Sequence, residues 1–170
     1  MTAVIVPPEL YFKSGYLTNI AVPGDSILIK GPRQEGKAST AFSLLRDMME
    51  YSGLWKSGEV RVLMFSKSAL ASEAARASTR FKKSFDLHQD RITSVSTTEE
   101  LLATESILIE EKLNREEEFL FILIDDADYI MTHQLGHLLN IQKEYGAVLI
   151  ATSGHENIPG IEPSEVINLP

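Results

Sequence analysis

The sequence predicts an α/β protein: a three-layer α/β/α sandwich around a mostly parallel sheet. Three observations lead to this prediction. Short runs of β-branched and other apolar residues alternate along the chain with segments of helical periodicity. One run, Phe119–Ile124, is apolar throughout without alternation, which is typical of a central strand covered on both faces. The length of 170 residues fits about one domain, on the usual prior of roughly 100–200 residues.

Each further element follows from a local pattern. Besides 119–124, short apolar runs bounded by turn residues predict strands at 26–30, 60–65, 91–95, 147–151 and 166–169. Helical spacing predicts helices at 36–51, 69–83, 96–114 and 133–143. The third helix is expected to begin with a capping box formed by Ser96 and Glu99, and the fourth to place Leu135, Leu138 and Leu139 on one face. Residues 1–25, rich in turns, form a lead-in segment of a single domain spanning 1–170.

Composition excludes several classes of protein. The chain has no Cys, which removes disulfide scaffolds, thiol nucleophiles and thiolate metal sites. Its net charge of −8 argues against a surface coated in basic charge, although eight Glu in residues 99–118 account for most of the imbalance. We expect no secretory signal, and the sequence has no apolar run of about 18 residues that could span a membrane. We therefore expect an intracellular protein, in the cytoplasm or the nucleus.

The most informative stretch is GPRQEGKAST, residues 31–40, which matches the phosphate-loop pattern G-x-x-x-x-G-K. It follows a predicted strand and opens a predicted helix, as the mechanism requires. Backbone amides of such a loop surround a phosphate, the glycines Gly31 and Gly36 allow its close approach, and Lys37 adds a positive charge. The next residue should be Ser or Thr, whose hydroxyl binds Mg²⁺, but Ala38 stands there. Ser39 follows, rotated about 100° around the helix, and so is only a weak substitute as a metal ligand.

Two other predicted strands end in polar residues. The run 119–124 leads into Asp125 and Asp126, and the run 147–151 leads into Thr152. Acids often end buried strands, and turn chemistry alone also favours Thr-Ser-Gly at 152–154. Together with the phosphate loop, however, these polar ends indicate a site that binds a nucleotide and its metal ion.

The layout resembles the P-loop NTPases of the branch with an extra strand between the phosphate loop and the Walker B strand. Within that branch it most resembles the RecA-like ATPase core of recombinases, their paralogues and KaiC-type proteins. The residues that carry this resemblance are VPGD before SILIKG, VRVLMF, RITSVSTTEELL, FLFILIDDADYI and GAVLIATSG. About 130 of the 170 residues are covered, and the phosphate loop and Walker B strand are the specific parts.

The resemblance implies ATP and Mg²⁺ as ligands and assigns a role to each residue. Lys37 would contact the β- and γ-phosphates, Asp125 would hold Mg²⁺ through water, and Asp126 would orient the attacking water. Thr152 would sense the γ-phosphate, and Arg33 would touch a phosphate or a neighbouring subunit. Because the family usually has Glu where Asp126 stands, and because Ala38 replaces a Mg²⁺ ligand, the expected hydrolysis is slow or dependent on a partner.

The sequence is compatible with three functions. The first is a RecA-like ATPase that acts in DNA recombination or repair within a homo- or hetero-oligomer. The second is a degenerate RecA-fold scaffold without hydrolysis, and the third is a viral DNA-packaging terminase ATPase domain, which shares the Arg-Gln-x-Gly-Lys form of the loop. The basic residues that would track a nucleic-acid backbone recur on one side of the predicted helix 69–83, namely Arg76, Arg80 and Lys83, with Lys82 beside them. A solvated helix face explains them equally well.

A pair of histidines gives a weaker indication of a metal site. His133 and His137 are spaced i, i+4, as in zinc-protease helices. The general-base Glu of those helices would stand at position 134, where this chain has Gln134. We therefore expect no metal here other than nucleotide-bound Mg²⁺.

Overall fold

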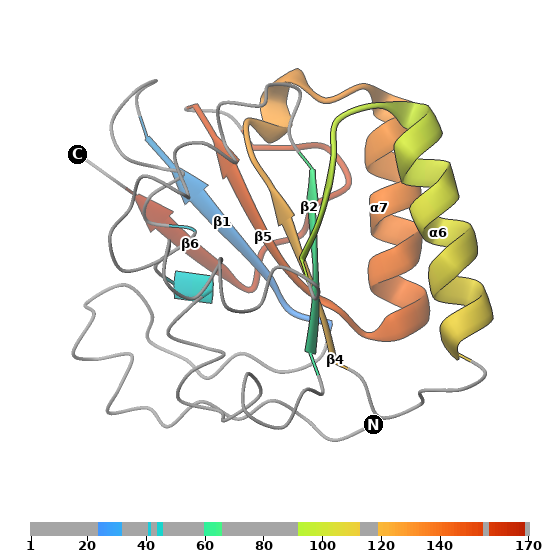
Figure 1. Ribbon diagram of the computed structural model, residues 1–170. Helices are drawn as coiled ribbons and strands as arrows, with labels where there is room; N and C mark the ends of the chain where they lie inside the picture. Colours follow the sequence, from blue (N-terminus) through green and yellow to red (C-terminus); the bar gives the residue numbers. More distant parts are fainter. Residues whose placement is uncertain are drawn as a thin grey trace, which may run out of the picture.

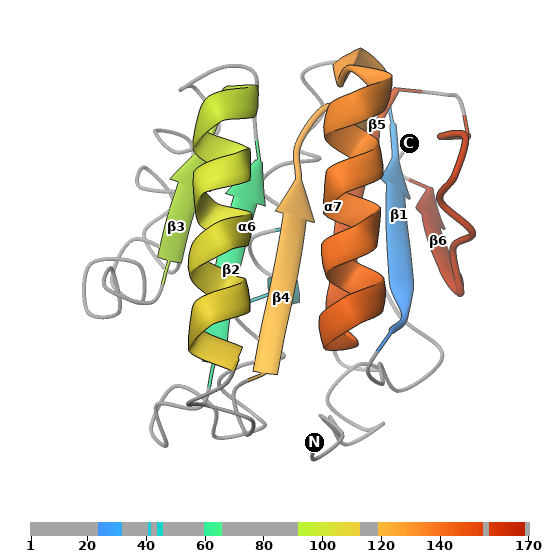
Figure 2. The same cartoon turned by 90° about the vertical axis from the view of Figure 1, so that its right-hand side faces the viewer.

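The computed structural model describes residues 24–31, 41, 44–45, 60–65, 92–112, 119–154 and 157–168. Within these residues six strands form one sheet in the order β3-β2-β4-β5-β1-β6 (Figures 1 and 2). Their bounds are Ser26–Lys30 for β1, Val60–Phe65 for β2, Ile92–Val95 for β3, Phe119–Ile124 for β4, Val148–Ser153 for β5 and Glu165–Asn168 for β6.

Every neighbouring pair of strands in this sheet is parallel. Parallel neighbours require crossover connections, which explains the alternation of strand-like and helix-like segments in the sequence. The α/β fold with a mostly parallel sheet is therefore confirmed. β5 lies between β1, which precedes the phosphate-loop sequence, and β4, which precedes the acid pair. This is the extra strand that the resemblance predicted.

The predicted strands match the observed ones closely, and the differences have a physical cause. β1, β2 and β4 have the predicted bounds, whereas β5 continues through Thr152 to Ser153. It does so because β1 supplies a partner as far as the pair Lys30 and Ser153. Thr152 and Ser153 are both fully buried. The end of the apolar run therefore underestimated the length of this strand.

Two helices cover one face of the sheet side by side, α6 at Thr98–Lys112 and α7 at Thr132–Tyr145 (Figure 2). Two contacts show that they run in the same direction. Thr98 contacts His133 near the amino ends of the two helices, and Glu105 contacts His137 further along both. α7 ends at Gly146, whose φ of 63° is the left-handed conformation that suits glycine at a helix end. None of the helices in the described ranges is long and apolar enough to cross a membrane.

The predicted capping box of α6 is wrong by one residue. Thr97, not Ser96, caps the helix, because the amide of Glu100 donates to Thr97 Oγ1 at 3.2 Å. The amide of Leu101 donates to the Thr97 carbonyl at 3.0 Å, which is the first helical hydrogen bond. The partner acid is accordingly Glu100 instead of Glu99. Ser96 still takes part, since both its amide and its hydroxyl donate to Glu100 Oε1.

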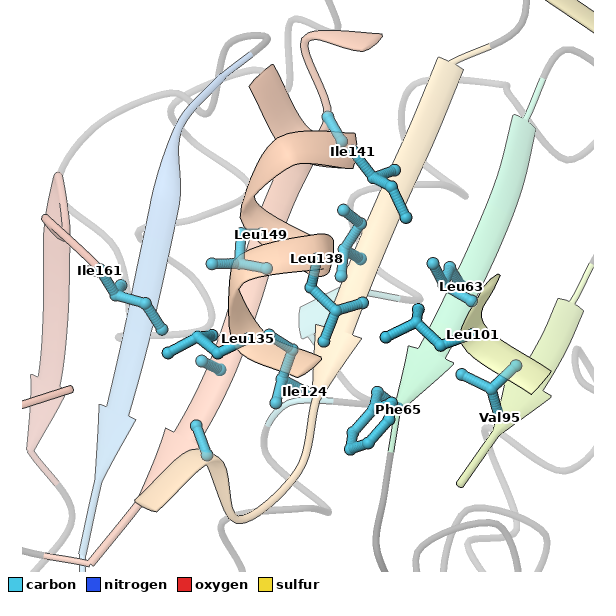
Figure 3. Packing of buried hydrophobic residues seen from close by; sticks show 14 of the residues in the cluster. Leu63, Phe65, Val95, Leu101, Ile124, Leu135, Leu138, Ile141, Leu149 and Ile161 are labelled. Carbon is cyan, nitrogen blue, oxygen red and sulfur yellow. The ribbon is translucent and has the colours of Figure 1, made fainter. Parts of the chain in front are cut away.

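The main core lies between α6, α7 and the sheet (Figure 3). Leu101 from α6, with Leu135 and Leu138 from α7, packs on strand residues that include Phe65 and Ile124. The alternate strand residues, such as Ile27, Ile29 and Phe121, are buried as well, so both sheet faces are covered. On the face opposite α6 and α7 lies a short helical segment that includes the buried Leu44 and Leu45, within the predicted helix 36–51 (Figures 1 and 2).

Candidate functional site

The carboxyl ends of β1, β4 and β5 lie next to one another at one edge of the sheet. The amide of Gly31, directly after β1, donates to the carbonyls of Ser153 at 3.3 Å and Gly154 at 3.0 Å, at the end of β5. The structure thus brings the first residue of the phosphate-loop sequence beside the end of the predicted sensor strand. The Gly31 amide is therefore already bonded to the end of β5.

Thr152 joins the two acids that follow β4. Its hydroxyl donates to Asp125 Oδ1 at 2.7 Å and accepts the backbone amide of Asp126 at 2.8 Å. The side chain has no exposed surface, whereas Asp125 and Asp126 are half-buried. A hydroxyl has a single proton to donate, and here the proton goes to Asp125. Thr152 therefore fixes the orientation of the Asp125 carboxylate.

Asp126 adopts a backbone conformation that is rare for residues with a side chain. Its φ of 52° and ψ of 55° are left-handed, and it is the one non-glycine residue with positive φ in the described ranges. Asp tolerates this region better than most residues, but the conformation still has an energetic cost. The turn sends the chain into the 3₁₀ helix η2, Ala127–Tyr129, whose Tyr129 amide donates to the Asp126 carbonyl at 2.9 Å. The strain is thus located beside the candidate metal ligand, Asp125.

A third acid, Asp128, connects this turn to the end of β5. Its Oδ2 accepts the backbone amide of Gly154 at 3.0 Å, and the Gly154 carbonyl in turn accepts the amide of Gly31. A Cβ added at Gly154 would lie 3.1 Å from Asp128 Oδ2, so the close approach favours glycine. The sequence motifs do not single out Asp128 as a site residue. The available signal was its position in Asp-Asp-Ala-Asp after one strand, opposite Thr-Ser-Gly after another.

The remaining predicted site residues lie outside the described residues. For the nucleotide these are Arg33, Gly36, Lys37, Ala38 and Ser39, and for nucleic acid they are Arg76, Arg80, Lys82 and Lys83. Their roles stay predictions. Gly31, Asp125, Asp126 and Thr152 are the predicted site residues that the structure describes, and it brings all four to one edge of the sheet.

The two histidines of α7 connect this helix to α6. His133 Nε2 lies 3.0 Å from Thr98 Oγ1, and His137 Nδ1 lies 3.1 Å from Glu105 Oε2. Between them, the buried Gln134 donates to Thr98 Oγ1 at 3.0 Å and accepts the amide of Met131 at 3.3 Å. Across the described residues, no three His, Asp or Glu side chains are grouped so that they could hold a metal ion.

Comparisons with known proteins identify the class of fold. The sequence matches no model of a known protein family and no curated protein. In structure, 146 chains match, among them PCH-2 of C. elegans, an AAA+ P-loop ATPase. The similarity to PCH-2 has a TM-score of 0.51 at 18% sequence identity and covers 86% of this chain. This chain spans 36% of the PCH-2 chain. The likeness supports a P-loop NTPase fold broadly.

Proposed function

We propose that this chain is an ATP-binding P-loop domain with slow, Mg²⁺-dependent hydrolysis. The observation that carries the proposal is the junction of three strand ends. There Asp125 and Asp126 lie on either side of the Thr152 hydroxyl, and Gly31 is bonded to the same end of β5. In open α/β sheets, ligands bind outside the carboxyl ends of the strands, which is where these residues lie. The sequence G-x-x-x-x-G-K begins at Gly31.

The residues at this edge fit a magnesium–nucleotide complex. Mg²⁺ is usually held by one or two carboxylates together with phosphate oxygens and water, and Asp125 and Asp126 supply two half-buried carboxylates. When bound, Mg²⁺ would neutralise charge on the phosphates of ATP. Asp125 would hold the ion, Lys37 would contact the phosphates, and Asp126 would orient water. Thr152 would keep the Asp125 carboxylate in place. Its hydroxyl could donate to the γ-phosphate only after its hydrogen bond to Asp125 is broken.

Three features explain why hydrolysis should be slow. Ala38 removes a hydroxyl ligand of the metal, and Asp126 is one methylene shorter than the Glu usual in the family that the sequence resembles. The proton of Thr152 is already donated to Asp125. The alternative function, a scaffold without hydrolysis, is favoured by the same three features.

Calorimetry with ATP and Mg²⁺ tests nucleotide binding. We expect the wild type to bind and Lys37→Ala to bind at least about tenfold more weakly, because the phosphates lose a positive partner. Asp125→Asn should weaken binding in Mg²⁺ but not in EDTA. Lys143→Ala, which removes an exposed Lys of α7, is the matched control. A wild type that binds no ATP, or a Lys37→Ala variant that binds as well as wild type, would contradict the proposal.

Measuring the release of phosphate from ATP distinguishes a slow ATPase from a scaffold that does not hydrolyse ATP. If Asp126 orients water, then Asp126→Glu should raise the rate several-fold by restoring the longer side chain, and Lys37→Ala should abolish it. ATP binding without any release, in the wild type and in Asp126→Glu alike, would favour the scaffold.

We infer a RecA-like ATPase that assembles with similar subunits, since the chain carries the RecA-like sequence stretches and its fold is similar to that of an AAA+ protein. A role in DNA recombination or repair depends on Arg76 and Arg80. Anisotropy of labelled DNA over a salt series tests it, and binding that is unchanged in the double Arg→Ala variant would contradict it. Continuation of the natural chain into a nuclease domain would favour the terminase alternative.

A further inference from the structure

A groove lies between α6 and α7, lined by residues from the middle and carboxyl-terminal part of α6 and the carboxyl-terminal half of α7. It has a volume of about 810 Å³. Glu105 and Ile109 of α6 line one wall, and Ile141, Glu144 and Tyr145 of α7 line the other. These residues lie one helical turn apart on their helices, so the groove follows the direction of the helix axes. Its volume has room for several side chains of a partner.

The α6 wall carries apolar surface that the core does not use. Leu101 and Leu108 point into the core and are buried, whereas Leu102 and Ile109 are 42% and 57% exposed. Residues seven apart lie on nearly the same side of a helix, so Leu102 and Ile109 form a second apolar stripe beside the buried one. Ile109 lines the groove. An exposed Leu alone is ordinary, but a two-turn stripe that enters a groove is suited to a partner helix.

The charge at the groove is negative. Two of the three charged side chains that line the groove among the described residues are acidic, Glu105 and Glu144. Glu105 also contacts His137 Nδ1 at 3.1 Å. The other four Glu of α6 lie outside the lining and add to the negative charge of this helix. Burial, followed by the carboxylates of Glu144 and Glu105, raises the pKa of the Tyr145 hydroxyl, so this group lies in the field of both acids. Lys143 is the one basic side chain among the described residues that line the groove. A second copy of this acidic face would be repelled.

We propose that the groove binds an amphipathic helix of a partner protein whose polar face carries Lys or Arg. The apolar face of that helix would cover Ile109 and continue along the stripe toward Leu102. Its basic residues would reach Glu144, Glu105 and the Tyr145 hydroxyl. Such a helix in a groove is a common mode of peptide recognition, with apolar anchors at helical spacing and charges that set the orientation. This interaction is independent of the proposed nucleotide site.

A labelled peptide of Leu and Lys, about 18 residues long with Leu at i, i+3, i+4 and i+7 spacing, is the probe. We expect Ile109→Ser to weaken its binding about tenfold through loss of an apolar contact. Ile107→Ser is the matched control, because Ile107 lies on the same helix at a similar exposure of 50% but does not line the groove. Glu144→Gln should weaken binding several-fold and flatten its salt dependence.

A scrambled peptide of the same composition separates recognition from general charge attraction. Equal binding of both peptides, or equal loss in Ile109→Ser and Ile107→Ser, would overturn the proposal. Sedimentation of the free protein tests a second copy as the occupant. A dimer that Ile109→Ser dissociates and Ile107→Ser does not would also overturn the proposal, because the groove would then bind another copy of this chain.

Discussion

At each of the two edges of the parallel sheet a buried polar side chain bridges neighbouring segments, and the two side chains differ in what they contact. At the amino edge, Gln142 of α7 donates to the carbonyls of Gly24 and Asp25 at 3.2 Å each, and to Ser26 Oγ at 2.9 Å. At the carboxyl edge, the hydroxyl of Thr152 contacts Asp125 and the amide of Asp126. The first side chain satisfies neutral groups at a strand start, and the second holds a carboxylate that remains half-exposed.

The two edges also differ in which residues adopt a positive φ. At the amino edge, the two residues with positive φ are glycines, Gly24 and Gly146, which adopt it without a steric cost. At the carboxyl edge, Asp126 adopts it despite its side chain. Residues in sparsely populated backbone conformations cluster at functional sites. The comparison therefore indicates that the amino edge contributes stability and that the carboxyl edge gives up some stability to keep its acids in place.

The largest expected effect is at the amino edge. Gln142→Ala removes the donor shared by three acceptors and leaves a cavity under the end of α7. We expect the free energy of unfolding in urea to fall by about 2–3 kcal/mol. ATP binding of the folded variant should stay unchanged. Asn140→Ala, an exposed position of the same helix, is the control and should change stability by less than about 0.5 kcal/mol. A Gln142→Ala variant as stable as this control would break the comparison.

The next effect is at the carboxyl edge. Thr152→Val keeps the shape of the side chain but leaves the Asp126 amide and Asp125 Oδ1 without their hydroxyl partner. We expect a loss of about 1–2 kcal/mol in unfolding free energy. Phosphate release should fall further than ATP affinity, because Asp125 loses its orientation. Thr93→Val, at an exposed Thr of β3, is the control. Unchanged release together with reduced stability would show that Thr152 has a structural role alone.

The sequence predicted the strands and the polar strand ends because their signals are local. The run Phe119–Ile124 is apolar whatever lies next to it, and the two acids follow it directly. By contrast, Gln142 bonds to residues more than 110 positions away, and nothing in the helical pattern around Leu138 indicates that partner. Asp128 was missed for the same reason, since its partner Gly154 lies on another strand end. The cap of α6 was placed one residue early because Ser96, Thr97, Glu99 and Glu100 allow two overlapping boxes.

A substitution at Asp126 should have a smaller effect and should raise the unfolding free energy instead of lowering it. Asp126→Gly removes the side chain that makes the left-handed conformation costly, so we expect unfolding free energy to rise by up to about 1 kcal/mol. ATP hydrolysis should be lost with the carboxylate. Asp126→Ala separates the two effects, because it removes the carboxylate but keeps the Cβ and should give no gain in stability. A glycine variant no more stable than the alanine variant would show that Asp126 is not strained.

The smallest effect concerns the first turn of α6. Hydrogen bonds from the side chains of Thr97 and Ser96 hold the pKa of Glu100 below its ordinary value of 4.5. A carboxyl whose pKa is lowered by folding stabilises the protein above its unfolded pKa, and this contribution is lost as the pH falls through the folded pKa. Glu100→Gln should therefore lower the Tm slightly at pH 7, with the difference from wild type shrinking below about pH 4.5. Glu99→Gln removes the same charge one residue earlier, from a side chain without a hydrogen bond in the described part of the chain. Equal pH profiles for the two variants would assign the effect to the helix dipole instead of the cap.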